Sequence, residues 1–489
     1  MNNKMNNIVN DNTDKRKKIN SLEYCYATRT DDNGKRIADD YRSTGGFLFK
    51  WEGTFWEKQD PELFEKGVLE WIGEYHPSEY SQRKARSAME SFACSVNRLE
   101  EDKCDDVVIP CLDGWLLIDE DGKAKIEAPD KNRTITYKVN AAINAPVGSE
   151  YEPKALPSDS MFKRFIESSL PDADTRALVQ EYCGYSLTRK TDKQRFQMWI
   201  GQGGNGKSQL VSLLLNLHSN PVNVNLAKLE GFNSKLHNAS FLYSTETSAV
   251  RGGIDEEALK KITDGEAIDI ERKGKDSFTY MPTAKLLMLC NEFPNLSDLS
   301  DAIFRRLDLI EWNSSFSDSK DRIDDIGGKI WRDEADLFLS WCVEGLIRFH
   351  RNGRKFTVSE KVDAAKAVFR RKADKIRAWL DDVELAYDPT ETEYTEKQLI
   401  YDNFVMWQKD NGYKSSVSSE SFWGKIQAIF RKEGFIAREI RKGPRGAQTR
   451  VVPFYFKDKV EARKEQDRID FEEFEKEGFP GDNVVMLKR

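Results

Sequence analysis

The stretch FQMWIGQGGNGKSQLVSLLLNLH, residues 196–218, decides the fold of this chain. Its first five residues form an apolar run typical of a buried strand, and the leucines after residue 208 recur with helical spacing. A glycine-rich G-x-x-x-x-G-K-S loop joins the two segments. Strand, loop and helix in this order are the context in which the motif binds nucleotide phosphates. The sequence therefore predicts an α/β domain built around a phosphate-binding loop.

The loop contains the groups that phosphate binding needs. Its glycines let backbone N–H groups face the phosphates, and the following helix directs its positive N-terminal end to the same place. Lys207 is expected to reach the β- and γ-phosphates of ATP, and Ser208 to bind Mg²⁺. A glycine-rich turn without function is the alternative, which the flanking strand and helix disfavour. The predicted nucleotide-binding residues are Gly201, Gly203, Gly204, Asn205, Gly206, Lys207, Ser208 and Gln209.

Two further apolar segments end in polar residues that suit catalysis. Residues 241–243 form one predicted strand, soon followed by Glu246, and residues 284–290 form another, followed by Asn291. Because ligands of open α/β sheets collect at the carboxyl ends of the strands, these residues should meet the phosphate loop. Glu246 is then expected to polarise the attacking water and to help hold Mg²⁺. Asn291 is expected to contact the γ-phosphate, although on its own it could be a turn residue.

Arg305 and Arg306 enter the apolar segment at residues 307–310. Burying such cations is expensive unless they meet an anion. The γ-phosphate bound by a neighbouring subunit is such an anion, and one of the two would then be an arginine finger acting in trans.

The order GQGGNGKS, FLYSTET, KKITDGEAIDIERKGK, KLLMLCNEFP and AIFRRLDLIEW resembles the superfamily 3 helicases, especially the poxvirus and phage or plasmid primase-helicase branch. The likeness covers about residues 105–350. It implies an AAA+-like ATPase that forms a hexameric ring around DNA and moves 3′ to 5′ on one strand. It assigns the catalytic acid to Glu246, the sensor to Asn291, and the finger to Arg306 or Arg305. Arg306 is favoured because LDLIEW after it matches the strand that follows the family's finger.

The chain departs from the family in two places. Position 245 is Thr, where many ATPases have Asp before the glutamate, so Mg²⁺ coordination depends more on Ser208 and water. The primase domain that often precedes such helicases is not recognisable in the first 150 residues. A separately encoded primase or polymerase is therefore an expected partner.

Two basic segments are candidate DNA contacts. Arg272, Lys273 and Lys275 form the tip of a predicted hairpin that, in the family, projects into the ring channel and holds single-stranded DNA by sequence-blind phosphate contacts. Residues 420–460 contain ten Lys or Arg against four acids and read as helices followed by a hairpin wing. We expect a winged helix on duplex DNA. An exposed basic hairpin and a structural or protein-binding winged helix are the alternatives. The C-terminal candidates are Arg441, Lys442 and Arg445.

Composition excludes several classes of protein. No apolar run approaches the roughly 18 residues of a membrane helix. Seven scattered cysteines and four histidines give no disulfide framework, zinc site or metal-dependent nickase site. Asp119 and Asp121 form a D-x-D pair, which we interpret as a surface turn. With a net charge of −7, any nucleic-acid surface must be local. We expect a cytoplasmic protein in a bacterial host cell, without a membrane partner.

The predicted fold is α/β, with an AAA+-like P-loop ATPase core, a small α+β N-terminal domain and a C-terminal winged-helix domain. The predicted function is an ATP-dependent, homo-hexameric helicase that acts on single-stranded and forked DNA in replication of a phage, virus or mobile element. The alternatives are an ATP-regulated DNA-binding initiator and a remodelling or packaging ring ATPase without strand separation. The predicted domains are a disordered arm (1–40), the N-terminal domain (41–155), the ATPase domain (156–352), a helical linker (353–388), the winged helix (389–460) and an acidic tail (461–489). Within them, hairpin turns are expected at residues 52–53 and 113–114, and helices at about 78–99, 359–382, 395–408 and 419–432.

Overall fold

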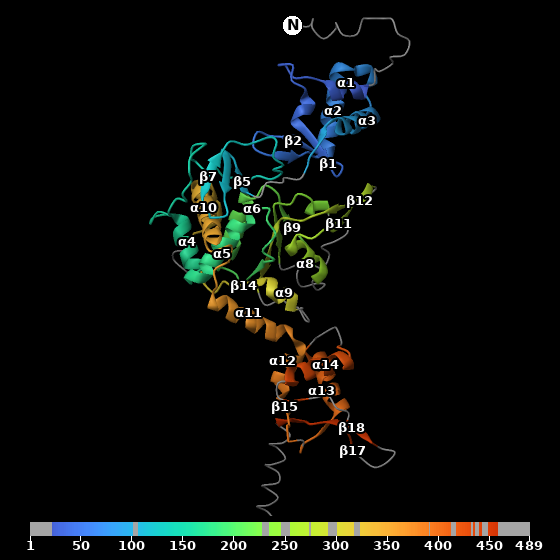
Figure 1. The fold of residues 1–489 in the computed structure, drawn as a ribbon, viewed down its shortest axis with the longest axis vertical. Coiled ribbons are helices and arrows are strands. Elements are labelled where there is room, and N and C mark those ends of the chain that lie inside the picture. The colour runs from blue at the N-terminus through green and yellow to red at the C-terminus, as the bar shows by residue number, and fades with distance from the viewer. Residues whose placement is uncertain are drawn as a thin grey trace, which may run out of the picture. The chain divides into compact units, whose positions relative to one another are not determined.

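The computed structural model describes residues 22–100, 106–226, 234–245, 255–272, 275–291, 301–316, 323–390, 392–411, 417–431, 434–435, 440–442 and 448–457. The chain forms two compact units, each with its own hydrophobic core. The first comprises residues up to 294 together with 305–366, and the second comprises 295–304 together with 367 onwards. Figure 1 shows the order of the elements along the chain.

A parallel five-stranded sheet forms the centre of the first unit. Its middle strands are almost fully buried, which agrees with their continuous apolar runs. The strand order is β14-β8-β13-β10-β9, so β13 lies between β8 and β10. The strands are β8 (Phe196–Ile200), β9 (Pro221–Asn223), β10 (Phe241–Ser244), β13 (Lys285–Cys290) and β14 (Leu307–Glu311).

Helices α5 (Ala173–Ser186) and α10 (Ile326–Arg351) pack closely together, as Figure 1 shows. A Cβ at Gly184 would lie 2.2 Å from the carbonyl oxygen of Cys342, and one at Gly345 would lie 2.5 Å from that of Gln180. Glycine at both places therefore lets the two backbones touch. The Tyr182 hydroxyl of α5 also donates to the Leu286 carbonyl of β13, 2.5 Å away, which ties this helix to the sheet. Helices α4 (Met161–Ser169) and α6 (Lys207–Leu217) pack against α10, and α8 (Glu256–Asp264) packs against β11 (Ile268–Arg272).

Gly184→Ala is expected to destabilise the first unit by about 1–3 kcal/mol, because the added methyl group overlaps the backbone of α10. Gly67→Ala is the matched control: Gly67 is an exposed helical glycine with no atom within 4 Å of the place its methyl group would take, so alanine should stabilise by about 0.5–1 kcal/mol. Thermal unfolding of both variants measures the difference. Equal melting temperatures would show that the contact is relaxed in solution.

The N-terminal part of the first unit has a mixed sheet of order β3-β2-β1-β4 beside three helices. The expected hairpin at residues 52–53 joins β2 and β3, and the expected helix at 78–99 is α3. The helix α2 was not expected from the sequence; it begins at Asp60, whose carboxylate accepts from the backbone N–H groups of Glu62 and Leu63. The elements are α1 (Leu22–Thr28), η1 (Ile37–Asp40), β1 (Tyr41–Thr44), β2 (Phe47–Trp51), β3 (Trp56–Lys58), α2 (Pro61–Tyr75), η2 (Pro77–Glu79), α3 (Gln82–Ser95) and β4 (Asn97–Arg98).

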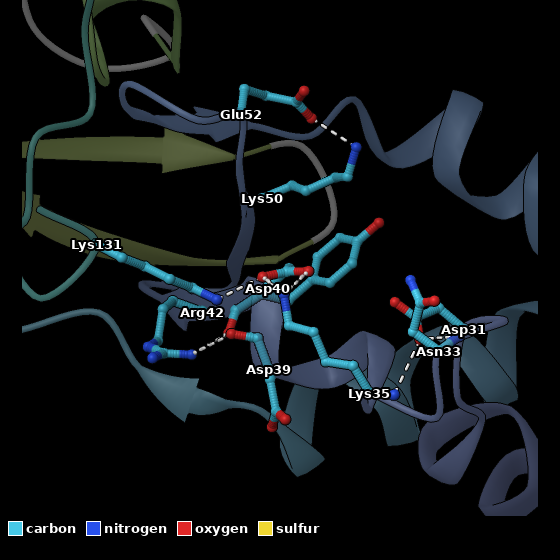
Figure 2. Close-up of polar contacts among 10 residues, drawn as sticks. Asp31, Asn33, Lys35, Asp39, Asp40, Arg42, Lys50, Glu52 and Lys131 are labelled. Atoms are coloured by element: carbon cyan, nitrogen blue, oxygen red, sulfur yellow. Dashed lines mark hydrogen bonds and ion pairs between the residues drawn. The ribbon is translucent and has the colours of Figure 1, made fainter. Parts of the chain in front are cut away.

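The segment 131–139 connects this N-terminal part to the remainder of the unit. Figure 2 shows Asp40 between the ammonium groups of Lys35 and Lys131. Burial opposes ionisation of Asp40, but hydrogen bonds from Lys131 and Lys35 hold its pKa below the usual value. Further along, the backbone N–H of Trp56 donates to the Ile135 carbonyl at 2.7 Å. The segment is therefore fixed to both η1 and the sheet of the N-terminal part.

An antiparallel sheet, β5-β6-β7, packs in the same core as the central sheet. The expected hairpin at residues 113–114 joins β5 and β6. Asp119 and Asp121 lie in the turn after β6, as expected, where the Asp119 carboxylate accepts from the backbone of Lys123 at 2.8 Å. Among the described residues, no three His, Cys, Asp or Glu side chains gather as a metal site would require. The strands are β5 (Val107–Cys111), β6 (Gly114–Ile118) and β7 (Ala124–Glu127).

The expected helix at residues 359–382 is two helices, α11 (Glu360–Ala373) and α12 (Lys375–Val383). The interruption has a local cause, because the Asp374 carboxylate accepts from the backbone N–H groups of Ile376 and Arg377 and caps α12. Nowhere in the described ranges does a helix combine the length and apolar character that a membrane span requires.

The second unit packs its helices on two small antiparallel sheets of order β15-β19 and β16-β18-β17. Its core is rich in aromatic side chains, among them Trp379, Phe404, Phe422 and Phe454. The helices expected at 395–408 and 419–432 are α13 and α14. The elements are β15 (Leu385–Tyr387), β16 (Thr395–Glu396), α13 (Lys397–Asp410), α14 (Ser419–Phe430), β17 (Ile440–Lys442), β18 (Thr449–Val452) and β19 (Phe454–Phe456).

Candidate active site

The glycine-rich loop runs from the end of β8 to Lys207, the first residue of α6. Gly206 has a φ of +86°, and a Cβ there would lie 2.5 Å from the Ser169 hydroxyl oxygen, so only glycine fits. The Asn205 side chain fixes the loop from within. Its amide donates to the Trp312 carbonyl at 2.9 Å, and its oxygen accepts from the backbone N–H of Lys207 at 3.2 Å. The loop conformation is therefore determined by its own sequence and by the end of β14.

Lys207 is 5% exposed, and its ammonium group lies between the ends of two neighbouring strands. It donates to the Gly201 carbonyl at 2.8 Å and to the Cys290 carbonyl at the end of β13. The Gly201 N–H also donates to the Cys290 carbonyl, at 3.2 Å. These hydrogen bonds hold the ammonium at the junction of the phosphate loop and the end of β13, which is where the motif requires a cation.

The sheet brings the predicted sensor to the phosphate loop. Asn291 follows β13 directly and lines the same cavity as the loop. Ser244 ends β10 and pairs with Met288 of β13, so the chain leaves β10 beside the sensor strand. Glu246, the predicted catalytic acid, lies outside the described residues.

A cavity of about 980 Å³ opens over the loop. Its polar part contains the loop backbone, and Ser208, a predicted Mg²⁺ ligand, is exposed there. Its apolar part comes from α4, from the segment after β14 and from residues 323–326, for which no sequence motif predicted a role in nucleotide binding. This combination fits ATP, with the phosphates at the loop and the flat base against apolar side chains. The apolar lining residues are Met161, Phe165, Phe316, Ile323 and Ile326.

The two candidate finger arginines end α9 (Asp301–Arg306) but differ in their surroundings. Arg306 is 6% exposed, and its guanidinium donates to both carboxylate oxygens of Asp264, with Nε 2.7 Å from Oδ1. The hydrogen bond to Asp264 raises the pKa of Arg306. Arg305 is exposed, and no residue in the described ranges forms a hydrogen bond or ion pair with it. The expectation that burying these arginines needs an anion is therefore met for Arg306 by Asp264 of the same chain.

Asp264 also connects this pair to the predicted DNA-binding hairpin. It ends α8, and Gly265 closes the helix with a φ of +69° before the chain enters β11. Strands β11 (Ile268–Arg272) and β12 (Lys275–Tyr280) form the predicted hairpin, with Arg272 opposite Lys275 at its end. Lys273 lies outside the described residues.

The predicted C-terminal DNA contacts lie on the second unit. Arg441 and Lys442 belong to β17, at the edge of the three-stranded sheet. The Lys442 ammonium lies 3.3 Å from the centre of the Tyr394 ring, which holds this cation at the surface. Arg445 lies outside the described residues.

Comparison with known proteins finds viral relatives of this chain. A family model described as a family of unknown function (DUF5906) matches residues 199–306, which include the phosphate loop, the hairpin and both arginines. The protein named "Putative helicase 184R" of Invertebrate iridescent virus 6 is 26% identical over 325 residues, 57% of this chain and 31% of that protein. "Putative helicase L207/L206" of Acanthamoeba polyphaga mimivirus is 24% identical over 287 residues, 52% of this chain and 29% of that protein.

These viral relatives are named as helicases. They support a viral, helicase-like protein, and this chain spans about three tenths of the length of each. A solved structure of the C-terminal region of NrS-1 covers 84% of this chain and 95% of its own, with 14% identity and a TM-score of 0.45. The relatives say nothing of a bacterial host, so that expectation stays a prediction.

Proposed function

We propose that this chain is an ATP-dependent DNA helicase of superfamily 3 type that works in viral replication. The observation that supports this most directly is the position of Lys207, whose ammonium lies between the ends of β8 and β13 above a cavity that also contains Asn291. A phosphate loop and a polar strand-end residue on one cavity are what nucleotide hydrolysis requires. Unwinding of a forked duplex, measured with and without ATP, tests the proposal.

In this proposal the candidate residues bind the nucleotide and activate the attacking water. The Lys207 ammonium leaves its carbonyl partners to contact the β- and γ-phosphates, while the loop N–H groups hold their oxygens. Ser208 and Glu246 hold Mg²⁺, which when bound offsets the charge that develops on the phosphate oxygens. Glu246 orients and polarises the attacking water, and Asn291 donates to the γ-phosphate.

The strand order supports the AAA+-like assignment, because it places the ends of β8, β13 and β10 next to one another. The phosphate loop, the sensor and the segment leading to the catalytic acid then share one edge of a parallel sheet. For the second unit we propose a winged helix, with α13 and α14 as its helices and β17–β18 as its basic wing. A hexameric ring is the assembly that lets an arginine of one subunit serve its neighbour.

For the finger we propose Arg305. An exposed guanidinium can reach a neighbour's γ-phosphate directly, whereas Arg306 would first have to leave a buried ion pair with Asp264. Arg306 then becomes a positioning residue. It holds the end of α9 against the end of α8, the helix that leads into the hairpin.

Glu246→Gln is expected to slow ATP hydrolysis at least ~100-fold while nucleotide binding persists, because the amide cannot accept a proton from water. Single-turnover hydrolysis and equilibrium binding of a labelled nucleotide separate the two effects. Wild-type turnover in this variant would show that the catalytic acid is a different residue.

Lys273→Ala combined with Lys275→Ala is expected to leave basal ATPase activity intact and to abolish DNA-stimulated ATPase and unwinding. Losing two phosphate contacts should also lower the log–log salt dependence of single-strand binding by roughly 1.4. The matched control removes two lysines from the preceding helix, Lys260→Ala with Lys261→Ala, whose side chains pair with Glu256 and Glu257. Equal behaviour of both double variants would favour an initiator or remodelling ATPase over a translocating motor.

A further inference from the structure

A second cavity, of about 510 Å³, lies in the first unit and shares no lining residue with the nucleotide cavity. Its volume falls within the ~300–1,000 Å³ typical of small-molecule sites. Its walls come from the N-terminal sheet, the segment 133–137, the residues that follow α5, and the end of β12. None of the sequence motifs predicted a ligand here.

Arg189 forms a rigid, charged wall of this second cavity. Its Nη1 donates to the Ala239 carbonyl at 3.1 Å and to the Thr283 hydroxyl at 2.7 Å, and its Nη2 donates to the Asn238 side chain at 3.3 Å. The guanidinium carbon lies 4.4 Å from the centre of the Tyr137 ring. These hydrogen bonds use three of the five N–H donors of an arginine. All its described partners are neutral, so a fixed positive charge remains for an anion.

Other cations surround Arg189. Lys190 and Arg133 also line the cavity, whereas the carboxylates of Glu100 and Asp106 line it from exposed positions. Behind the wall, the Lys285 ammonium donates to the carbonyls of Thr188 and Thr283, each at 2.8 Å. Burial and the neighbouring charge of Arg189 hold the pKa of Lys285 well below its usual value. Arg189, Lys190 and Arg133 thus place three basic side chains on the lining of this cavity.

Aromatic rings form a further part of the cavity surface. His237 is stacked on Phe47 with 4.1 Å between ring centres and an interplanar angle of 15°. Its ring also lies 5.3 Å from that of Phe278 and 5.0 Å from that of Tyr280. Phe278 and Tyr280 belong to β12, whose other end is Lys275 at the hairpin tip. Phe278 lies three positions after Lys275 on the strand, which corresponds to about 10 Å, so the hairpin extends from its basic end to this cavity.

We propose that the second cavity binds one nucleotide unit of the DNA strand held by the hairpin. The phosphate contacts Arg189 and Lys190, and the base lies against the aromatic side chains of Tyr137, Phe278 and Tyr280. Phosphate contacts combined with aromatic stacking are the usual means of holding single strands without sequence preference. This inference rests on the proposed helicase function and adds a second binding site for the same strand.

Two variants test the phosphate contact in the full-length chain. Arg189→Gln removes the charge, and Lys190→Glu reverses one; Lys193→Glu, three residues away and outside the cavity lining, is the matched control. Each test variant should weaken oligothymidylate binding roughly tenfold, the value of one charge-assisted hydrogen bond. Arg189→Gln should also lower the log–log salt slope by about 0.7. Thermal unfolding checks that each variant is folded. If Arg189→Gln does not fold, Lys190→Glu still tests the phosphate contact, because it leaves the hydrogen bonds of Arg189 in place.

Crosslinking locates the strand directly. An oligothymidylate with 5-iodouracil substituted for thymine should crosslink to peptides containing Tyr137 or residues 278–280, and the yield should fall in Arg189→Gln. Free dTMP at the same nucleotide concentration should not reduce the crosslink. Competition by dTMP would overturn the DNA strand as the occupant in favour of a free nucleotide.

The outcomes separate this inference from the proposed function. If both test variants bind oligothymidylate like Lys193→Glu, and crosslinks appear only in other peptides while forks are unwound, the second cavity is not a DNA site and the helicase proposal stands. If the wild-type chain neither binds single strands nor unwinds forks, the helicase proposal fails and this inference fails with it.

Discussion

Lys207→Ala is expected to reduce ATP hydrolysis roughly 1,000-fold and to abolish unwinding. This is the upper end of the effect seen when one pre-organised donor to a developing charge is removed. The ammonium lies at the junction of the phosphate loop and the end of β13, where a terminal phosphate would meet it. Its removal leaves two carbonyls with one fewer donor, which costs about 1 kcal/mol each. The chain should therefore remain folded.

Lys163→Ala is the control for this variant, because Lys163 lies on α4 beside the nucleotide cavity but does not line it. Phosphate release and thermal unfolding, measured on both variants and the wild type, separate catalysis from stability. A Lys207→Ala chain that hydrolyses ATP at a near-normal rate would contradict the phosphate-loop assignment.

Arg305→Ala is expected to lower ATPase activity by roughly 10³-fold or more, the contribution of an arginine finger, without a change in stability. Part of the activity should return when Arg305→Ala subunits are mixed with Lys207→Ala subunits. The Arg305→Ala subunit then provides an intact ATP site, and the neighbouring Lys207→Ala subunit provides an intact Arg305. Native mass spectrometry confirms that mixed assemblies form. Mixed assemblies without recovered activity would contradict a finger acting in trans.

Arg306→Ala is the informative comparison, since it should destabilise the first unit rather than act only on catalysis. Removing one partner of a buried ion pair costs about 3–5 kcal/mol. We expect the lower end, about 3 kcal/mol, because Asp264 borders an open cavity through which water can reach its carboxylate. A fall in ATPase activity with unchanged stability for Arg306→Ala alone would return the finger role to Arg306.

Local patterns predicted the parts of the fold that depend on neighbouring residues in the sequence. The run 196–200, the loop and the leucine pattern after it correspond to β8 and α6, and the basic hairpin corresponds to β11 and β12. Two local features did not follow from the sequence pattern. Val68 and Ile72 are β-branched, which is common in strands, yet they form the buried face of α2. One continuous helix was expected at residues 359–382, but the Asp374 carboxylate caps a new helix within that range.

The site could be predicted only where it follows the chain order. Lys207 and Asn291 are each recognisable from the strand that precedes them, and the sheet brings them to one cavity. The choice between Arg305 and Arg306 depends on Asp264, forty residues earlier, and no spacing rule connects them. The apolar wall around Phe165 and Phe316 likewise comes from segments about 150 residues apart. Sequence order alone contains no signal for such contacts.

The glycine contact between α5 and α10 offers a way to recognise distant relatives. Gly184 and Gly345 are fixed by the approach of two backbones and take no part in the nucleotide cavity. Chains that share this scaffold should keep very small residues at both positions even where their phosphate loop has decayed. A relative that keeps both small residues but lacks the phosphate loop has lost the ATPase activity and kept the fold. A relative that lacks both features has lost the fold itself, and a search for the loop motif alone cannot distinguish the two cases.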